Sequence, residues 1–353
     1  MRTSTRTVAA ALALVAIAIP TTVHADSPPT LSEPIAEGLA GPLQLTVQGD
    51  NVYVGQAFAG LLTKIDKNGA TENLAVNPGG EIAGSALDGQ TVVYTTRNGP
   101  PTGRPDSSTL SRVRRGTTSV VADLLAYEVE NNPDGDVEYG FDGISDECAA
   151  QLPPEVGPPT YTGLVDSHAY GVAEGAHKWY IADAGGNDIL AVSSKGVVST
   201  VAVLPPQPLV ITAETAATVG FPECTVGLTY NFEAVPTDVE VSNSGILYVT
   251  TLPGGPEDPS LGARGSVYAV DPSNGEVALV AGGFLGATNL AIGKRGAIYV
   301  AELFGGRVSQ IVDGVPQTVV ELPQPAGLEW ANGKLYVSYD VFGPSGKVAT
   351  ISV

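Results

Sequence analysis

The stretch VEVSNSGILYVT, residues 239–250, decides the fold of this 353-residue chain. It contains a short alternating segment at 239–241, a tight polar turn at 243–245, and a second segment that carries Tyr248 and Val249. Alternation of apolar and polar side chains with period two is typical of a half-buried strand, and Asn, Ser and Gly favour tight turns. The stretch therefore predicts a two-stranded β-hairpin.

The hairpin pattern recurs along the whole chain. Its second strand carries a tyrosine followed by a small or β-branched residue, and this pair occurs six times: Tyr53-Val54, Tyr94-Thr95, Tyr180-Ile181, Tyr248-Val249, Tyr299-Val300 and Tyr336-Val337. Two further short strand patterns follow each pair, as at 307–312 and 317–321. Four short strands per repeat are typical of a propeller blade. The sequence predicts an all-β fold, a six-bladed β-propeller.

The last repeat offers only three strand patterns, at 327–330, 334–339 and 347–353. A fourth is available near the N-terminus, at 30–34. We expect this N-terminal strand to close the last blade, because closure removes the exposed edge that an open sheet leaves.

Composition and the N-terminus restrict the class further. Gly and Pro, which break helices, make up about a fifth of the chain and exclude a helical bundle. A net charge of −20 argues against nucleic-acid binding. Arg2 and Arg6 precede a short apolar run, and Val23-His24-Ala25 has the form of a cleavage site. This arrangement predicts a signal peptide over 1–25, the alternative being a buried first strand or helix. The apolar run is too short to span a bilayer, so we expect a secreted protein without a membrane span.

The mature chain, 26–353, is predicted to be one propeller with long insertions at 128–168, 203–235 and 252–264. Each insertion joins strands at the same end of the ring, so they gather on one face, as a binding surface does. Cys148 and Cys224 lie in the first two insertions. Export permits a disulfide that would staple both loops over the mouth of the ring, the alternative being two buried thiols. We expect short helices near Ser145 and over 211–219.

Aligned blades place Gln44, Asp238 and Asn289 near the top of first strands that face the central funnel. Carboxylate and amide oxygens are ligands for calcium, so these three are candidate metal ligands, the alternative being caps of strand ends. Tyr170 and Asp183, at the funnel end of the third repeat, join them as candidate ligand-binding residues. No cofactor is required by the sequence, and calcium is the one we consider.

Two further features are less specific signals of a functional site. His168 enters the third repeat on the insertion face, and is the one histidine of the mature chain that is placed to act as a general base; the alternative is a solvent-facing loop residue. If the protein is an enzyme, His168 or Glu302 would transfer protons. The segment 128–147 carries eight carboxylates but lacks the glycine and terminal acid of a calcium loop. It is interpreted as a solvated acidic loop, with ordering by a divalent ion as the alternative.

The third repeat resembles a known family. Residues 169–173, AYGVA, followed by 180–187, YIADAGGN, look like an NHL-type propeller repeat. With 131–135, NNPDG, with Asp166-Ser167, and with 236–239 and 299–302, they resemble the ScyD/ScyE family of secreted bacterial proteins. The resemblance implies a propeller and export, and it implies no particular activity. A cysteine-bearing insertion interrupts the family pattern between NPDG and Asp166-Ser167.

These observations favour a non-enzymatic extracellular binding or scaffold protein over an enzyme. The alternative is a calcium-dependent, lactonase-like hydrolase in which a metal in the funnel polarises a carbonyl. We expect a monomer whose partner is a small molecule, a glycan or an extracellular protein. Segments 128–168 and 203–235 hold thirteen of the 37 acids and no Lys or Arg. A partner of that face is therefore expected to be cationic, neutral or bridged by divalent ions.

Overall fold

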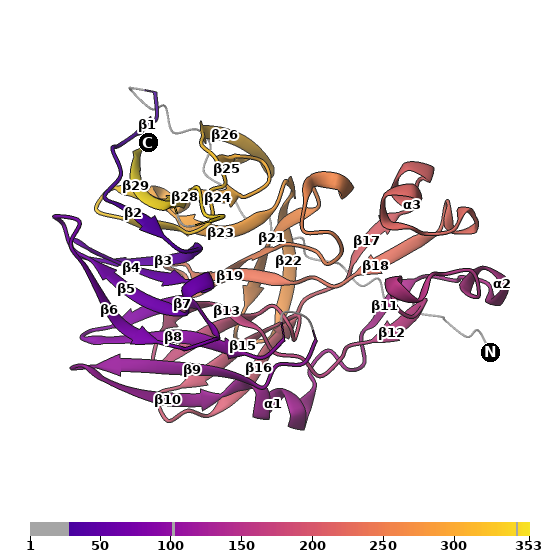
Figure 1. Ribbon diagram of the computed structural model, residues 1–353, viewed down its shortest axis with the longest axis horizontal. Coiled ribbons are helices and arrows are strands. Elements are labelled where there is room, and N and C mark those ends of the chain that lie inside the picture. The colour runs from indigo at the N-terminus through magenta and orange to yellow at the C-terminus, as the bar shows by residue number, and fades with distance from the viewer. Residues whose placement is uncertain (1–27, 101–102, 344) are drawn as a thin grey trace, which may run out of the picture.

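The structure is a computed structural model that describes residues 28–100, 103–343 and 345–353. The predicted signal peptide lies outside the described residues. The described residues form a ring of sheets with a projecting lobe (Figure 1). The fold is all-β, as predicted, and it is a β-propeller.

Five sheets of the ring have the same order, with four antiparallel strands in sequence from the inside outward. The first two contain β3 (Pro42–Gln48), β4 (Asn51–Gln56), β5 (Leu61–Ile65), β6 (Thr71–Val76), and β7 (Glu81–Asp88), β8 (Thr91–Asn98), β9 (Ser107–Arg114), β10 (Thr117–Asp123). The next three contain β13 (Ala169–Gly175), β14 (Lys178–Asp183), β15 (Asp188–Ser193), β16 (Val198–Val203), then β19 (Pro236–Val241), β20 (Leu247–Thr251), β21 (Gly265–Asp271), β22 (Glu276–Phe284), and β23 (Ala287–Ile292), β24 (Ile298–Glu302), β25 (Arg307–Val312), β26 (Val315–Glu321).

The remaining sheet of the ring is completed by both chain ends, as predicted. It contains β27 (Leu328–Ala331), β28 (Lys334–Tyr339) and β29 (Gly346–Ser352), and β29 pairs with β1 (Thr30–Leu31) and β2 (Ala36–Leu39). Thr30 lies opposite Ser352, and Ala36 opposite Val348. The first strands of successive sheets contact one another, and β27 contacts β3, which closes the ring.

The hydrophobic core lies between neighbouring sheets. One cluster combines Tyr180, Ile189 and Ala202 of the third sheet with Val239 and Val270 of the fourth. The six tyrosines of the repeat all lie on second strands, where the period-two pattern turns them into these layers. Between the last two blades, the Tyr299 ring stacks on Trp330 with centroids 6.1 Å apart.

The first two insertions form a sheet of their own, which the sequence did not predict. We call it the insertion sheet; it has the order β12 (Thr160–Thr162), β11 (Glu138–Phe141), β18 (Thr229–Phe232), β17 (Gln207–Val210). Its core contains Phe141, Ile211 and Tyr230, and Leu261 of the third insertion packs against it. The expectation of loops was wrong because strands of three or four residues, paired between two separate insertions, leave no periodicity to recognise. Figure 1 shows this sheet projecting away from the ring.

The helices are short and belong to the connections. Helix α1 (Leu124–Asn131) follows β10 directly, and at its start the Asp123 side chain accepts a hydrogen bond from the Ala126 amide. The expected helix after Ser145 is α2 (Asp146–Ala149), and the one expected over 211–219 is α3 (Ala213–Val219). Single 3₁₀ turns are η1 (Ala57–Ala59), η2 (Pro154–Val156), η3 (Glu223–Thr225), η4 (Pro259–Leu261) and η5 (Lys294–Gly296). Within the described residues, none of the helices is long and apolar enough to cross a membrane.

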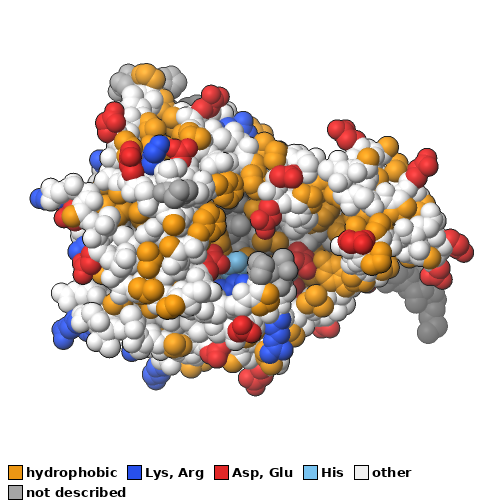
Figure 2. Space-filling model, viewed as in Figure 1, with side chains coloured by type: hydrophobic (Ala, Val, Ile, Leu, Met, Phe, Trp, Pro, Cys, Tyr) orange, Lys and Arg blue, Asp and Glu red, His pale blue; other side chains and the backbone are white. Residues whose placement is uncertain are grey.

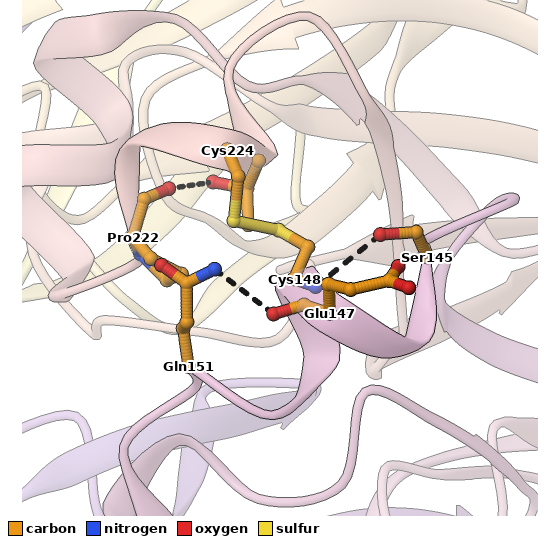
Figure 3. Close-up of a disulfide and its surroundings, with 7 residues drawn as sticks. Ser145, Glu147, Cys148, Gln151, Pro222 and Cys224 are labelled. Carbon is orange, nitrogen blue, oxygen red and sulfur yellow. Dashed lines mark hydrogen bonds between the residues drawn. A yellow bond between two sulfur atoms is a disulfide. The ribbon is translucent and has the colours of Figure 1, made fainter.

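A disulfide joins the two insertions, as predicted. Cys148 of α2 is bonded to Cys224 of η3, with Cα atoms 5.8 Å apart (Figure 3). The Ser145 hydroxyl accepts from the Cys148 amide at 3.3 Å and caps α2. Figure 1 shows α2 at the end of the insertion sheet that points away from the ring. The bond therefore closes the outer end of that sheet, and does not staple loops over the mouth of the ring as expected.

Candidate functional site

A layer of hydrogen-bonded polar side chains lines the central funnel, and we call it the neck. Gln44, Asp238 and Asn289 come together there on three first strands, as the alignment of blades predicted. The Asn289 amide donates to Gln44 Oε1 at 2.6 Å, and the Gln44 amide donates to the Thr237 carbonyl at 2.9 Å. Asp238 Oδ2 accepts from the Leu290 amide at 3.0 Å.

These hydrogen bonds decide how well the neck suits calcium. Asn289 Oδ1 accepts from the Leu328 amide at 2.8 Å, and Gln44 Oε1 is occupied by Asn289. A calcium ion needs six to eight oxygen ligands. It would have to break these bonds to use either amide oxygen, so the neck as built fits the predicted alternative, polar groups that join neighbouring strands. The metal assignment stays a prediction.

In the second and third sheets, glycines occupy the positions that are equivalent to Gln44 and Asn289. These glycines make the neck narrow on that side. A Cβ on Gly84 would lie 2.5 Å from the Tyr170 carbonyl oxygen, and one on Gly171 would lie 2.8 Å from the Asp238 Cα. The first strands of the second, third and fourth sheets therefore approach more closely than side chains would permit.

The cavity on the other side of the neck has a volume of about 300 Å³. It extends along the first strands from Gln44 to Gln48, and from Val172 to Glu174, toward the tight turns at the opposite end of the ring. Its described lining contains the four carboxylates of Asp238, Glu240, Glu329 and Glu174, and no Lys, Arg or His. We call this space the acidic cavity.

Burial weakens the acids of the acidic cavity. It raises the pKa of Glu329 to about 7, against hydrogen bonds from the Thr46 hydroxyl and the Trp330 amide. Burial, with the neighbouring carboxylates, raises the pKa of Asp238 and of Glu240 well above the ordinary value. A cation would be attracted because it relieves the repulsion between these groups.

The mouth on the insertion face holds the second candidate group of residues. His168 Nε2 lies 2.7 Å from Glu81 Oε2, and both side chains are partly exposed. The Tyr170 ring meets the His168 ring edge-on with centroids 5.6 Å apart. Burial raises the pKa of Tyr170 well above its ordinary value, so its hydroxyl stays protonated. Figure 2 shows a hollow on this side of the ring in which histidine, acidic and basic side chains meet.

Asp183 fixes the backbone at His168 through hydrogen bonds. Its Oδ1 accepts from the backbone amide of His168 at 2.6 Å, and its Oδ2 accepts from the Ser167 hydroxyl at 2.6 Å. Oδ1 also accepts from the amides of Gly185 and Gly186. Asp183 is only 2 % exposed, so its place is that of a positioning residue for the loop before β13.

Glu302 forms no hydrogen bond to the mouth residues or to the neck residues within the described part of the chain. It is fully buried, and its carboxylate accepts from the Arg307 guanidinium at 2.7 and 2.9 Å. The Ser309 hydroxyl and the Leu285 amide also donate to it. With its oxygens bound in this way, Glu302 joins strands β24 and β25 and the turn before β23, and His168 is the better placed of the two predicted proton carriers.

Sequence reasoning missed Glu81, Glu240 and Glu329. Two of these could have been found from the sequence, because residues two apart in a strand point to the same face. Glu240 lies two residues after Asp238, and Glu329 two residues after Gly327, so both follow an inward-facing position. Glu81 had none, since it meets His168 across 87 residues of sequence.

Comparison with known proteins supports the fold alone. No family model and no curated protein matches the sequence. Solved structures that resemble it include a catalytically inactive variant of virginiamycin B lyase from Staphylococcus aureus with quinupristin, with a TM-score of 0.51 and 15% identity over 92% of this chain and 99% of that one. Another is the PQQ-bound aldose sugar dehydrogenase from Streptomyces coelicolor, with a TM-score of 0.55 and 14% identity over 92% and 97%. A putative glucose dehydrogenase from Thermus thermophilus has a TM-score of 0.55 and 15% identity over 91% and 100%. The chain is thus similar to propeller-type proteins.

Proposed function

We propose that this chain is an exported β-propeller binding protein of the ScyD/ScyE type, which holds its ligand at the mouth of the ring beside the insertion sheet. The observation that carries the proposal is that three insertions, from different blades, assemble into one disulfide-closed unit on the insertion face. A chain that needs only a stable ring has no use for this addition, whereas binding residues are commonly carried by loops on a rigid scaffold.

The residues of the mouth indicate the ligand class. His168, Tyr170 and Glu81 offer one aromatic face, one hydroxyl and a histidine–carboxylate pair. Such groups suit a neutral polar ligand, a glycan above all, because a ring stacks on a sugar face while hydrogen bonds fix its orientation. The acids of the insertion sheet oppose anionic partners. We keep a small molecule or an extracellular protein as alternatives, and we expect a monomer.

The test compares two histidines at opposite ends of the ring. Wild type, His168→Ala and His177→Ala are titrated against neutral oligosaccharides, an oligolysine and an oligoglutamate. His177 lies in the turn between β13 and β14, away from the mouth. We expect the neutral oligosaccharide to bind, with at least tenfold weaker binding to His168→Ala and none of that loss in His177→Ala. Binding of oligoglutamate alone, or equal loss in both variants, would refute the assignment.

A second function is favoured by one observation, the 2.7 Å His168–Glu81 pair. A carboxylate that orients a histidine is a common general-base arrangement. The alternative is therefore a hydrolase of lactone type, with calcium at Gln44, Asp238 and Asn289 as the predicted metal. Assays of lactones and aryl esters with and without chelator test it. Turnover that disappears in His168→Ala but persists in His177→Ala would favour this function over simple binding.

A further inference from the structure

A second group of acids lies outside the neck and the acidic cavity, where the first insertion leaves the ring. Glu128 of α1, Asp134 of the following loop and Asp188 of β15 are 2 %, 0 % and 1 % exposed. Each has carboxylate oxygens that find no hydrogen-bond partner in the described part of the chain: Glu128 Oε1, Asp134 Oδ1, and both oxygens of Asp188. An unpaired buried carboxylate is costly, so four such oxygens need an explanation.

The three side chains come from separate segments but share one location. Glu128 Oε2 and Asp188 Oδ1 each lie 3.5 Å from the point that a Cβ on Gly186 would occupy. Asn187, next to Asp188, donates to Asp134 Oδ2 at 3.0 Å, which places the Asp134 carboxylate beside the start of β15. Oδ1 of the half-buried Asp166 is a further oxygen without a partner among the described residues.

Neighbouring donors satisfy only one side of the group. Asp134 Oδ2 accepts from the Tyr139 hydroxyl at 3.0 Å as well as from Asn187, while its Oδ1 has no partner among the described residues. The acids act on one another: burial raises the pKa of Glu128 to about 8, and the charges of Asp183 and Asp134 add to the shift. The described residues supply no salt-bridge partner to Glu128, Asp134 or Asp188.

We infer that Glu128, Asp134, Asp166 and Asp188 form a calcium site at the base of the insertion sheet. Calcium takes six to eight oxygens in a flexible geometry, from carboxylates in one or two contacts each. In the described residues no three acidic, histidine or cysteine side chains already surround a common ion position. Binding therefore draws the carboxylates inward by side-chain rotation, which calcium tolerates and the smaller magnesium ion resists.

The position of the site gives it a structural role. Glu128 and Asp134 precede the insertion sheet, Asp166 follows its β12 strand, and Asp188 belongs to the ring. An ion held by all four ties both ends of the first insertion to the third blade. This role is separate from the ligand at the mouth, and it differs from the funnel metal because the residues are different.

The first experiment measures calcium itself. Calorimetric titration and thermal unfolding of the mature chain are carried out in EGTA and in excess calcium. We expect one ion per chain and a rise in Tm of several degrees in calcium. Asp188→Asn and Glu128→Gln keep the side-chain shape, and each should weaken binding at least tenfold. Without calcium they should melt no lower than wild type, since they remove buried charge; a merely structural role for these residues predicts a lower Tm instead.

Two control variants separate this site from other acids. Asp238→Asn alters the neck, and Asp142→Asn alters an exposed acid of the insertion sheet; both should retain the calcium response. As an independent readout, terbium bound in place of calcium should emit on tyrosine excitation, because Tyr139 contacts Asp134. The inference is overturned by a wild type without calcium binding, by a response that survives in Asp188→Asn and Glu128→Gln, or by one that disappears only in Asp238→Asn.

Discussion

Removal of the disulfide should weaken the whole ring, although the bond lies at the outer end of the insertion sheet. Cys148 and Cys224 are 76 residues apart, and the loop they close contains the entire third blade, from β13 to β16. Loop-closure entropy for that length gives an upper value of about 4.5 kcal/mol, and measured bonds usually contribute about 2–4 kcal/mol. For a chain of this size the expected fall in Tm of Cys148→Ala/Cys224→Ala is roughly 3 to 6 °C.

The assay combines thermal unfolding with limited proteolysis. Besides its lower Tm, the double variant should be cut first within the insertion sheet, because that sheet has short strands and a small core of its own. Alkylation of intact wild type without reductant, followed by mass measurement, confirms that both cysteines are bonded at the start. A double variant that melts within about 1 °C of wild type and is cut no faster would refute the reasoning.

Three other substitutions test the ring. Glu302→Gln should lower the free energy of unfolding by about 3 kcal/mol in chemical denaturation, since it breaks a buried pair with a partly exposed arginine, while Glu276→Gln on the surface should leave it unchanged. Gly84→Ala should unfold or severely destabilise the protein, because its Cβ would lie 2.5 Å from the Tyr170 carbonyl oxygen, whereas Gly282→Ala, with 3.6 Å to its nearest neighbour, should be tolerated. Glu329 has its pKa raised from 4.5 to about 7 on folding, so its contribution to stability is greatest below pH 4.5 and is lost as the pH rises through 7. Glu329→Gln should therefore flatten the fall in Tm between about pH 5 and 8, and an unchanged pH profile would contradict this assignment.

The ring was predictable because its signals are local. Each tyrosine pair marks a second strand, and the missing outer strand of the last blade limits the search to the N-terminus, where β1 and β2 are found. Gln44, Asp238 and Asn289 were expected together for the same reason, since equivalent positions of a repeat meet around one axis. What the pattern does not contain is the direction of each hydrogen bond, and those bonds tie the neck oxygens to Leu290 and Leu328.

The insertion sheet and the buried acids beside it depend on pairings across long sequence separations. Glu138–Phe141 pairs with Thr229–Phe232, about ninety residues away, through only two registered positions. Glu128 and Asp188 likewise meet from different segments, without a fixed spacing that a motif would recognise. The acidic stretch 128–147 was visible in the sequence, but its division into buried and exposed acids was not, because burial depends on the partner strands.

That division changes what the negative charge means for a partner. Glu128 and Asp134 are buried at the base of the insertion sheet, where a calcium ion would neutralise them, so they contribute little to the field at the surface. The exposed acids, such as Asp142, Asp146 and Glu147, lie on the outer part of the sheet near the disulfide. The mouth instead contains His168 and its carboxylate partner. A cationic partner should therefore engage the outer sheet and lose affinity as salt is added, whereas a neutral ligand at the mouth should bind with little salt dependence. A salt titration of each bound probe, in wild type and in His168→Ala, distinguishes the two surfaces.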